Sequence, residues 1–221
     1  MRKKSQILVV ALAGLFLTSC AGETKTDDKS AANEKDMEME EVCMYSFDSD
    51  ASTLAFTAYK FTEKAGVGGE FTDLQVEGND QAESAKDLLE SLSFQIPISG
   101  LSTKNKPRDK KIDSLFFGAI NTEAITGEVI SVDADAGMAT IAIMMNGVSN
   151  EVEGKCTMSG DKFTFDAEIN VNNWNAQEGI KALNEGCKEL HTKEDADGNM
   201  ESKLWPDVSI SFETTLKKEC K

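Results

Sequence analysis

The chain has 221 residues, a formal net charge of −16, and hydrophobic residues at 40% of its positions. So acidic a chain repels nucleic acid and anionic lipid head groups, which excludes DNA binding and a charge-driven membrane role. Residues 43–221 are enough for one domain with a real core, and we find neither an internal repeat nor a second domain.

The first twenty residues, MRKKSQILVVALAGLFLTSC, predict a signal for export. Three positive charges precede an apolar run from Ile7 to Leu17, which is too short for a spanning helix of about 20 residues. The end of this run, Leu17 to Cys20, resembles the lipobox of bacterial lipoproteins. The resemblance implies a signal peptide at 1–19 and a diacylglycerol on the thiol of Cys20; an ordinary signal with a chance cysteine is the alternative.

We therefore expect an exported protein, lipid-anchored to a bacterial membrane at the periplasmic side of the outer membrane or at the cell surface. Residues 20–42 then form the lipidated Cys20 and an acidic, flexible tether, because they are polar and carry few large apolar side chains. Nothing else in the sequence is long and apolar enough to span a bilayer.

The rest of the chain is dominated by apolar residues at alternate positions, which predicts half-buried antiparallel strands. Eight such strands suggest a sandwich or an up-and-down barrel. The expected strands fall near residues 52–63, 67–77, 92–98, 125–133, 138–146, 150–158, 163–171 and 208–216. Two stretches differ: a short helix is expected near 80–92, and a longer helix near 173–191, where apolar residues recur every three or four positions.

Four cysteines follow Cys20, and in an exported domain they suggest two disulfides with three possible connectivities. If the sheet closes, its first and last strands become neighbours, which brings Cys43 near Cys220. Cys156 and Cys187 would then form the second pair. No two cysteines form a C-x-x-C pair, so neither a redox centre nor a zinc site is indicated.

Several segments together resemble the YceI-like family. They are Gly69-Glu70-Phe71 after an early strand, Asn105 followed by Arg108-Asp109 and Phe116-Phe117, and a later strand–GVSNEV–strand hairpin. The resemblance covers about residues 45–217 and implies an all-β fold: an antiparallel, eight-stranded, lipocalin-like barrel. It also implies an extended apolar ligand, such as a polyisoprenoid, a quinone or a fatty amide. The chain departs from the family at Lys111, where a histidine is frequent.

An eight-stranded barrel can be filled by its own side chains or can hold one small ligand, and the sequence leaves both open. The candidate lining is Phe56, Phe94, Ile96, Ile98, Phe116, Phe117, Ile141, Ile143, Phe163, Phe165, Ile169, Val208, Ile210 and Phe212. Three polar residues are expected at the barrel mouth: Asp109 as a helix-start residue, Arg108 as an ion-pair partner, and Lys111. Arg108 or Lys111 would contact a ligand's head group, or the Arg108–Asp109 pair would only fasten a loop.

No catalytic motif is present, and the one histidine, His191, has no partner that the sequence identifies. The acidic segment 195–201 is interpreted as a solvated turn rather than a calcium loop, because it lacks the full ligand series. We expect no enzyme, metal or cofactor, but a lipid-anchored protein that carries an apolar lipid. The alternative is a structural or interaction lipoprotein with a filled barrel.

Overall fold

The computed structural model describes residues 41–221; the expected signal peptide, Cys20 and most of the expected tether lie outside these residues. The described strands are β1 (Cys43–Ser46), β2 (Ser52–Lys60), β3 (Ala65–Phe71), β4 (Gln75–Glu77), β5 (Ser93–Pro97), β6 (Leu101–Ser102), β7 (Ala124–Asp133), β8 (Met138–Met145), β9 (Val148–Ser159), β10 (Lys162–Asn170), β11 (Thr192–Glu194), β12 (Met200–Ser202), β13 (Leu204–Thr215) and β14 (Lys217–Cys220). The helices are α1 (Ala85–Glu90), α2 (Lys106–Lys111), α3 (Gln177–Gly186) and α4 (Lys188–His191). In the described part of the chain, no helix is long and apolar enough to cross a membrane.

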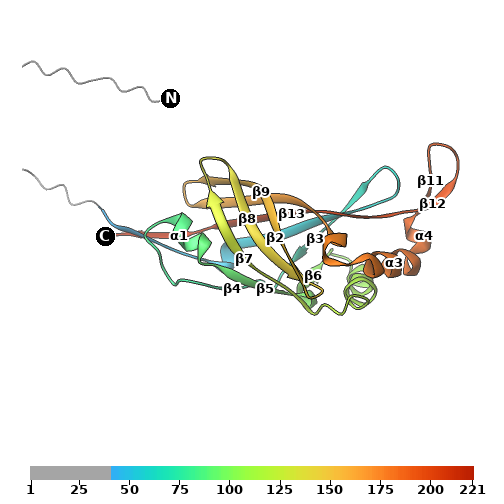
Figure 1. Ribbon diagram of the computed structural model, residues 1–221, viewed down its shortest axis with the longest axis horizontal. Coiled ribbons are helices and arrows are strands. Elements are labelled where there is room, and N and C mark those ends of the chain that lie inside the picture. Colours follow the sequence, from blue (N-terminus) through green and yellow to red (C-terminus); the bar gives the residue numbers. More distant parts are fainter. Residues whose placement is uncertain (1–40) are drawn as a thin grey trace, which may run out of the picture. The chain divides into compact units, whose positions relative to one another are not determined.

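One antiparallel sheet dominates the fold, with strand order β4-β5-β7-β8-β9-β10-β13-β2-β3-β6 (Figure 1). This confirms the expected antiparallel, all-β, lipocalin-like architecture, in which the sheet is curled into a half-barrel. The strand count differs slightly, because the two-residue β6 and the three-residue β4 are added to eight longer strands. The β1–β14 pair and the β11–β12 hairpin form two further small sheets.

The sheet curls because one stretch of chain contributes to both of its ends. β5 pairs with β7, whereas β6 pairs with β3 near the opposite end of the strand order. Only the short turn η2 (Ile98–Gly100) separates β5 from β6. Three residues span at most about 11 Å, so the two ends of the sheet are held close together. The backbone N–H of Thr72 strengthens this closure by donating to the carbonyl of Gly100 (2.9 Å).

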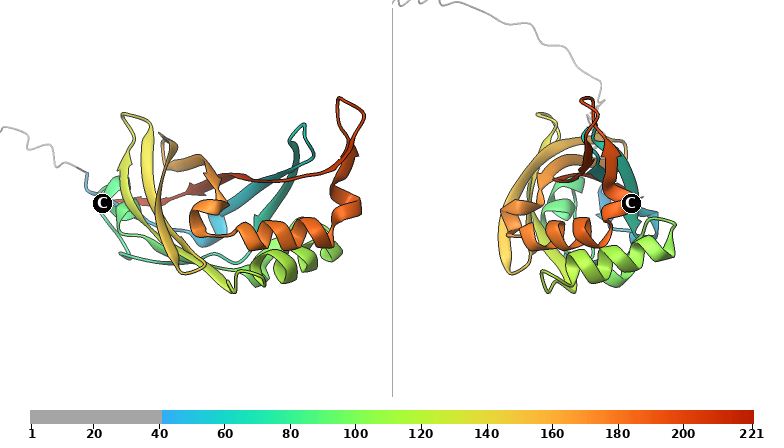
Figure 2. Two further views of the ribbon diagram at one scale, coloured as in Figure 1. Left: turned by 45° about the vertical axis from the view of Figure 1, so that its right-hand side comes forward. Right: turned by 90° about the vertical axis from the view of Figure 1, so that its right-hand side faces the viewer.

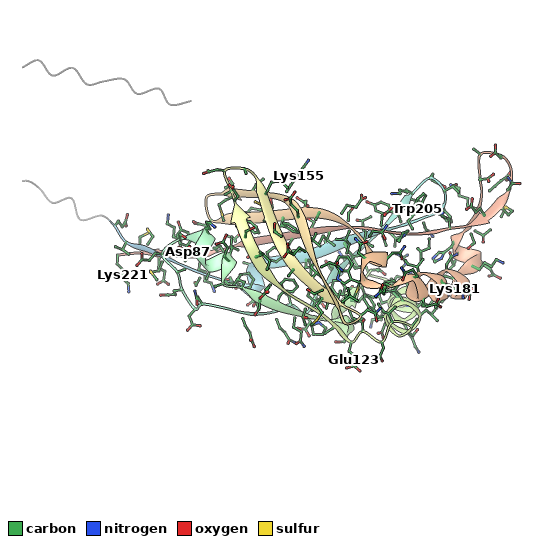
Figure 3. The ribbon with its side chains drawn as sticks, in the orientation of Figure 1. Asp87, Glu123, Lys155, Lys181, Trp205 and Lys221 are labelled. Atoms are coloured by element: carbon green, nitrogen blue, oxygen red, sulfur yellow. A yellow bond between two sulfur atoms is a disulfide. The ribbon has the colours of Figure 1, made fainter. Side chains whose placement is uncertain are left out.

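The alternation predicted from the sequence sets the inner face of the sheet. Across β10 and β13, Phe165 lies opposite Phe212 and Ala167 lies opposite Ile210, and Phe163 and Phe165 are buried. Figure 3 shows side chains filling the space between the curled strands, while Lys155 of β9 points away from the sheet. The apolar face is therefore inside and the charged face outside, as period-two patterning requires.

The first expected helix is present as α1, which begins at its N-cap Ser84. The Ser84 hydroxyl accepts from the backbone N–H of Asp87 (3.0 Å), which satisfies one of the free N–H groups at the helix start. Leu88 and Leu89 of α1 are almost completely buried. The helix therefore covers one end of the curled sheet (Figure 1).

The second expected helix is shorter and broken. Residues Val171–Trp174 form the 3₁₀ turn η4, Asn175 takes a left-handed conformation (φ 56°), and Cys187 separates α3 from α4. α3 lies alongside α2 and the π-helix η3 (Ile112–Phe117) at the end of the sheet away from α1 (Figure 2).

Among the four cysteines that the structure describes, one disulfide forms, between Cys43 of β1 and Cys220 of β14, which lie opposite each other in the strand register. The prediction of a second pair, Cys156 with Cys187, is wrong: both are free and buried. Cys156 lies beside the β7–β8 turn, where its N–H donates to the Gly137 carbonyl, whereas Cys187 ends α3 at the far end of the sheet. A disulfide needs Cα atoms within roughly 7 Å, so this separation forbids the bond.

We predict that a Cys43→Ser/Cys220→Ser double variant is less stable than the oxidised wild-type protein by about 2–5 kcal/mol, because the bond closes a very long loop in the unfolded chain. Urea denaturation measures the difference. A reductant should lower the wild-type stability to the level of the variant and leave the variant itself unchanged. Further destabilisation of the variant by reductant would reveal a second disulfide and contradict the assignment of two free thiols.

Candidate ligand-binding cavity

The interior of the curled sheet contains a cavity of about 140 Å³ whose wall is made entirely of apolar residues. Most of the lining expected from the sequence is present in this wall: Phe56, Phe94, Ile96, Ile141, Ile143, Phe163, Phe165, Ile169, Ile210 and Phe212. These side chains come from five different strands, so the cavity exists only because the sheet curls.

Four expected lining residues lie elsewhere: Ile98, Phe116, Phe117 and Val208. Phe116 and Phe117 belong to η3 and pack edge to face, with ring centroids 4.9 Å apart. They support α3, which passes so close that a Cβ on Gly179 would overlap the Phe116 ring. The two rings therefore fasten the helices at one end of the barrel instead of contacting a ligand. Because Phe116 and Phe117 lie in a helix, the alternation that marks strands cannot predict where their rings point.

Ile98 and Val208 lie outside the cavity wall because of their positions in the fold. Ile98 is buried in the η2 turn, where its N–H donates to the Glu123 carbonyl (2.9 Å). Val208 faces inward on β13 and packs against the core, but it lies beyond Ile210, toward the helical end. Both are packed core residues, which was the alternative role for every candidate.

Part of the cavity wall was not predicted from the sequence. The additional lining residues are Phe47, Leu54, Ala55, Phe71, Leu74, Val76, Leu89, Leu92, Ile125, Val129, Ala139, Met145 and Trp174. The alternation in residues 138–146 could have identified Ala139 and Met145. Leu89 and Trp174 close the cavity from α1 and η4, and no local pattern connects those segments with the barrel interior.

Trp174 shows how the wall stays apolar. Its side chain is almost completely buried, and its one polar group, the indole N–H, donates to the Ile143 carbonyl (2.9 Å). A buried N–H without a partner would attract water or a polar ligand group. Because this one is satisfied by the backbone, the ring presents only carbon to the cavity.

The three polar residues expected at the mouth do not reach the cavity wall. The helix-start residue is Asn105, whose side chain accepts from the Arg108 N–H, and not Asp109 as expected. Among the described residues Arg108 has no ion-pair partner, and its side chain is exposed, so that part of the prediction is wrong.

Asp109 has a structural contact instead. Its carboxylate accepts from the backbone N–H of Thr103 (2.8 Å) and from the Thr103 hydroxyl (2.5 Å). These bonds tie α2 to the segment that follows β6. Asp109 therefore fastens the loop, and neither it, Arg108 nor Lys111 lines the cavity.

His191 lies on α4, outside the cavity wall. Its Nδ1–H donates to the Asn184 side-chain oxygen (3.1 Å). Burial, and then the nearby charges of Lys60 and Lys111, hold the pKa of His191 below its ordinary value, so the ring is neutral at pH 7. A neutral ring held by an amide contributes to packing of the α4 segment.

The acidic turn 195–199 uses its carboxylate internally. Asp195 Oδ1 accepts from the N–H groups of Asp197 (2.9 Å) and Asn199 (2.8 Å). Within residues 41–221, no group of three or more His, Cys, Asp or Glu side chains is placed to hold a metal ion.

The cavity therefore offers a ligand dispersion contacts and shelter from water, but no nucleophile or acid–base group. It is also small, since pockets for drug-sized molecules typically measure about 300–1,000 Å³. A narrow, wholly apolar space inside an antiparallel barrel favours a slender hydrocarbon chain over a bulky or polar molecule.

A curled, lipocalin-like sheet around an apolar cavity defines a class of small binding barrels. The chain belongs to the YceI-like domain family, whose model matches residues 45–216. A search among curated proteins found no match.

Two solved structures share the fold. A polyisoprenoid binding domain from Saccharophagus degradans, implicated in plant cell wall breakdown, is 16% identical, with a TM-score of 0.56 over 79% of this chain and 98% of that chain. Burkholderia cenocepacia BcnA is 14% identical, with a TM-score of 0.51 over 78% of this chain and 99% of that chain. At these identities the similarity establishes the architecture.

We predict that Ala139→Leu leaves the free energy of unfolding within about 1 kcal/mol of wild type, because the added carbons enter existing space. In a fully packed core the same change would destabilise the protein by about 1–3 kcal/mol. Ala139 lines the cavity on β8, whereas Ala142 is on the opposite face of the same strand, so Ala142→Leu is the matched control. Urea denaturation of both variants measures the difference, and a loss confined to Ala139→Leu would mean that the barrel is filled.

Proposed function

We propose that this protein is an exported, lipid-anchored carrier that holds an extended apolar ligand inside its barrel and performs no chemistry on it. The ligand classes that fit are polyisoprenoids, quinone tails and fatty amides. The observation that carries the proposal is the cavity wall, in which every lining residue is apolar and the one indole N–H is bonded to the backbone. The similarity to a polyisoprenoid binding domain agrees with this class of ligand.

Binding of such a ligand does not require a polar contact. Each CH₂ group transferred from water into the barrel contributes about 0.8 kcal/mol, so affinity grows with the length of chain enclosed. The loss of translational and rotational freedom opposes binding by several kcal/mol, which only an extended chain overcomes. The strongly acidic exterior then keeps the loaded carrier soluble.

The proposed location rests on two features of the chain. The segment ending at Cys20 has the pattern of a lipoprotein signal. The Cys43–Cys220 disulfide agrees with an oxidising compartment outside the cytoplasm, where such bonds persist. Attachment through acyl chains on Cys20 would hold the barrel close to a membrane, from which an apolar ligand can be collected or to which it can be delivered.

Native mass spectrometry tests the proposal on protein purified from an exporting host with residues 1–20 removed. We expect a defined added mass that solvent extraction releases as a long-chain lipid or quinone. If the purified protein carries no added mass, and gains none after incubation with polyprenols and fatty amides, the carrier function is wrong. The remaining candidate is then an interaction lipoprotein with a filled barrel.

A further inference from the structure

Glycine lies beside three of the phenylalanine rings that line the cavity. Phe56 of β2 is directly opposite Gly69 of β3, and Phe94 of β5 is directly opposite Gly127 of β7. A Cβ placed on either glycine would come closer than 3.0 Å to the facing ring, a separation that real Cβ atoms essentially never show. The rings therefore occupy the space that a side chain on the neighbouring strand would otherwise take.

The third ring, Phe165 of β10, also lies over a glycine, Gly154 of β9, although its direct partner on that strand is Cys156. A phenylalanine that settles over a glycine lies against the sheet and projects less far into the barrel. These pairs therefore decide how much of the interior the aromatic rings leave open.

Gly69 differs from the other two glycines in what surrounds it. A Cβ on Gly127 or Gly154 would also collide with the backbone, at the carbonyl of Ala142 or Asp166. A Cβ on Gly69 would meet only the Phe56 ring at such short range, with the Ser102 carbonyl next at 3.1 Å. At position 69 the Ser102 carbonyl has to shift by only a few tenths of an ångström to admit a Cβ, whereas the ring of Phe56 has to move away.

The direction of that movement is limited by Phe71. Its ring centroid lies 5.5 Å from that of Phe56, on the same inner face of the β2–β3 pair. With Gly69 filled on one side and Phe71 on another, the Phe56 ring has open space beside it in the cavity that it already lines. A methyl group at position 69 therefore narrows the cavity by pushing the Phe56 ring into it.

We propose that the Phe56–Gly69 pair determines ligand specificity by setting the width of the cavity, so that wild-type protein admits one methyl-branched hydrocarbon chain and excludes fused rings. This inference rests on the proposed carrier function and refines its ligand class. It makes Gly69 a specificity-determining residue although a glycine offers the ligand no side chain. Narrowing the cavity selects against branched chains first, because their methyl groups make them wider than an unbranched acyl chain.

Equilibrium dialysis of radiolabelled geranylgeraniol and hexadecanamide, carried out on wild type and Gly69→Ala, tests the proposal. We expect Gly69→Ala to weaken binding of the branched geranylgeraniol about tenfold or more, as the misfit of single carbon groups does in apolar pockets, and to weaken hexadecanamide binding less. Gly68→Ala is the matched control, since its Cβ lies on the outer face with the nearest atom 3.9 Å away. It should bind both lipids as wild type does.

A second substitution separates the ring from the backbone. Adding Phe56→Leu to Gly69→Ala removes the displaced ring and should restore geranylgeraniol binding. Unchanged binding in Gly69→Ala, or no recovery in the double variant, would overturn the role of the pair while the carrier function stands. If wild type binds neither lipid nor any other long-chain compound, the carrier function itself fails and this inference with it.

Phe56→Leu alone gives an independent measurement should Gly69→Ala not fold. Loss of the ring widens the cavity, so the affinity for a radiolabelled sterol should rise about tenfold or more over wild type. A sterol affinity equal to that of wild type would contradict a width limit at Phe56.

Discussion

One stretch of chain, residues 93–102, pairs with strands at both ends of the main sheet, and the rest of the structure depends on this constraint. Because η2 separates β5 from β6 by only three residues, the sheet has to curl until β3 approaches the β5 side. Curling turns the apolar face of each strand toward the same interior. A flat sheet with the same alternation would expose that face, and no cavity could form.

The two ends of the curled sheet are closed by different means. At one end, Leu88 and Leu89 of α1 are buried, and the adjacent β1 bridges to Ala82 while the disulfide joins β1 to β14. At the other end, η3 and α3 pack against each other through Phe116 and Leu115, with glycines on α3 allowing the close approach. Hydrocarbon enclosed between these ends is separated from water, which is the source of affinity in a site without polar groups.

Alternation was sufficient to predict the eight longer strands of the main sheet and ten of the 23 residues in the cavity wall, because a period of two assigns each residue to a face. It could not assign Phe116 and Phe117, where the chain changes to a π-helix and the rings pack under α3. The Cys43–Cys220 pair was predicted from closure of the sheet and is present, although β1 and β14 pair in a small sheet of their own. Pairing the remaining cysteines by elimination failed, since Cys156 and Cys187 lie at opposite ends. The pairing of glycines with the rings could not be predicted from the sequence either, because only the strand register shows that Gly69 faces Phe56.

Fluorescence quenching can show whether a hydrocarbon chain lies inside the barrel. Trp174 lines the cavity, whereas Trp205 lies outside it on β13, with its indole N–H donating to the Phe61 carbonyl (Figure 3). Two variants, Trp205→Phe and Trp174→Phe, each leave one emitter to be titrated with a long-chain amide brominated at mid-chain. We expect saturable quenching of the Trp174 emission, with the Trp205 emission unaffected. Equal quenching of the two, or quenching of Trp205 alone, would place the chain on the surface and contradict its enclosure in the barrel.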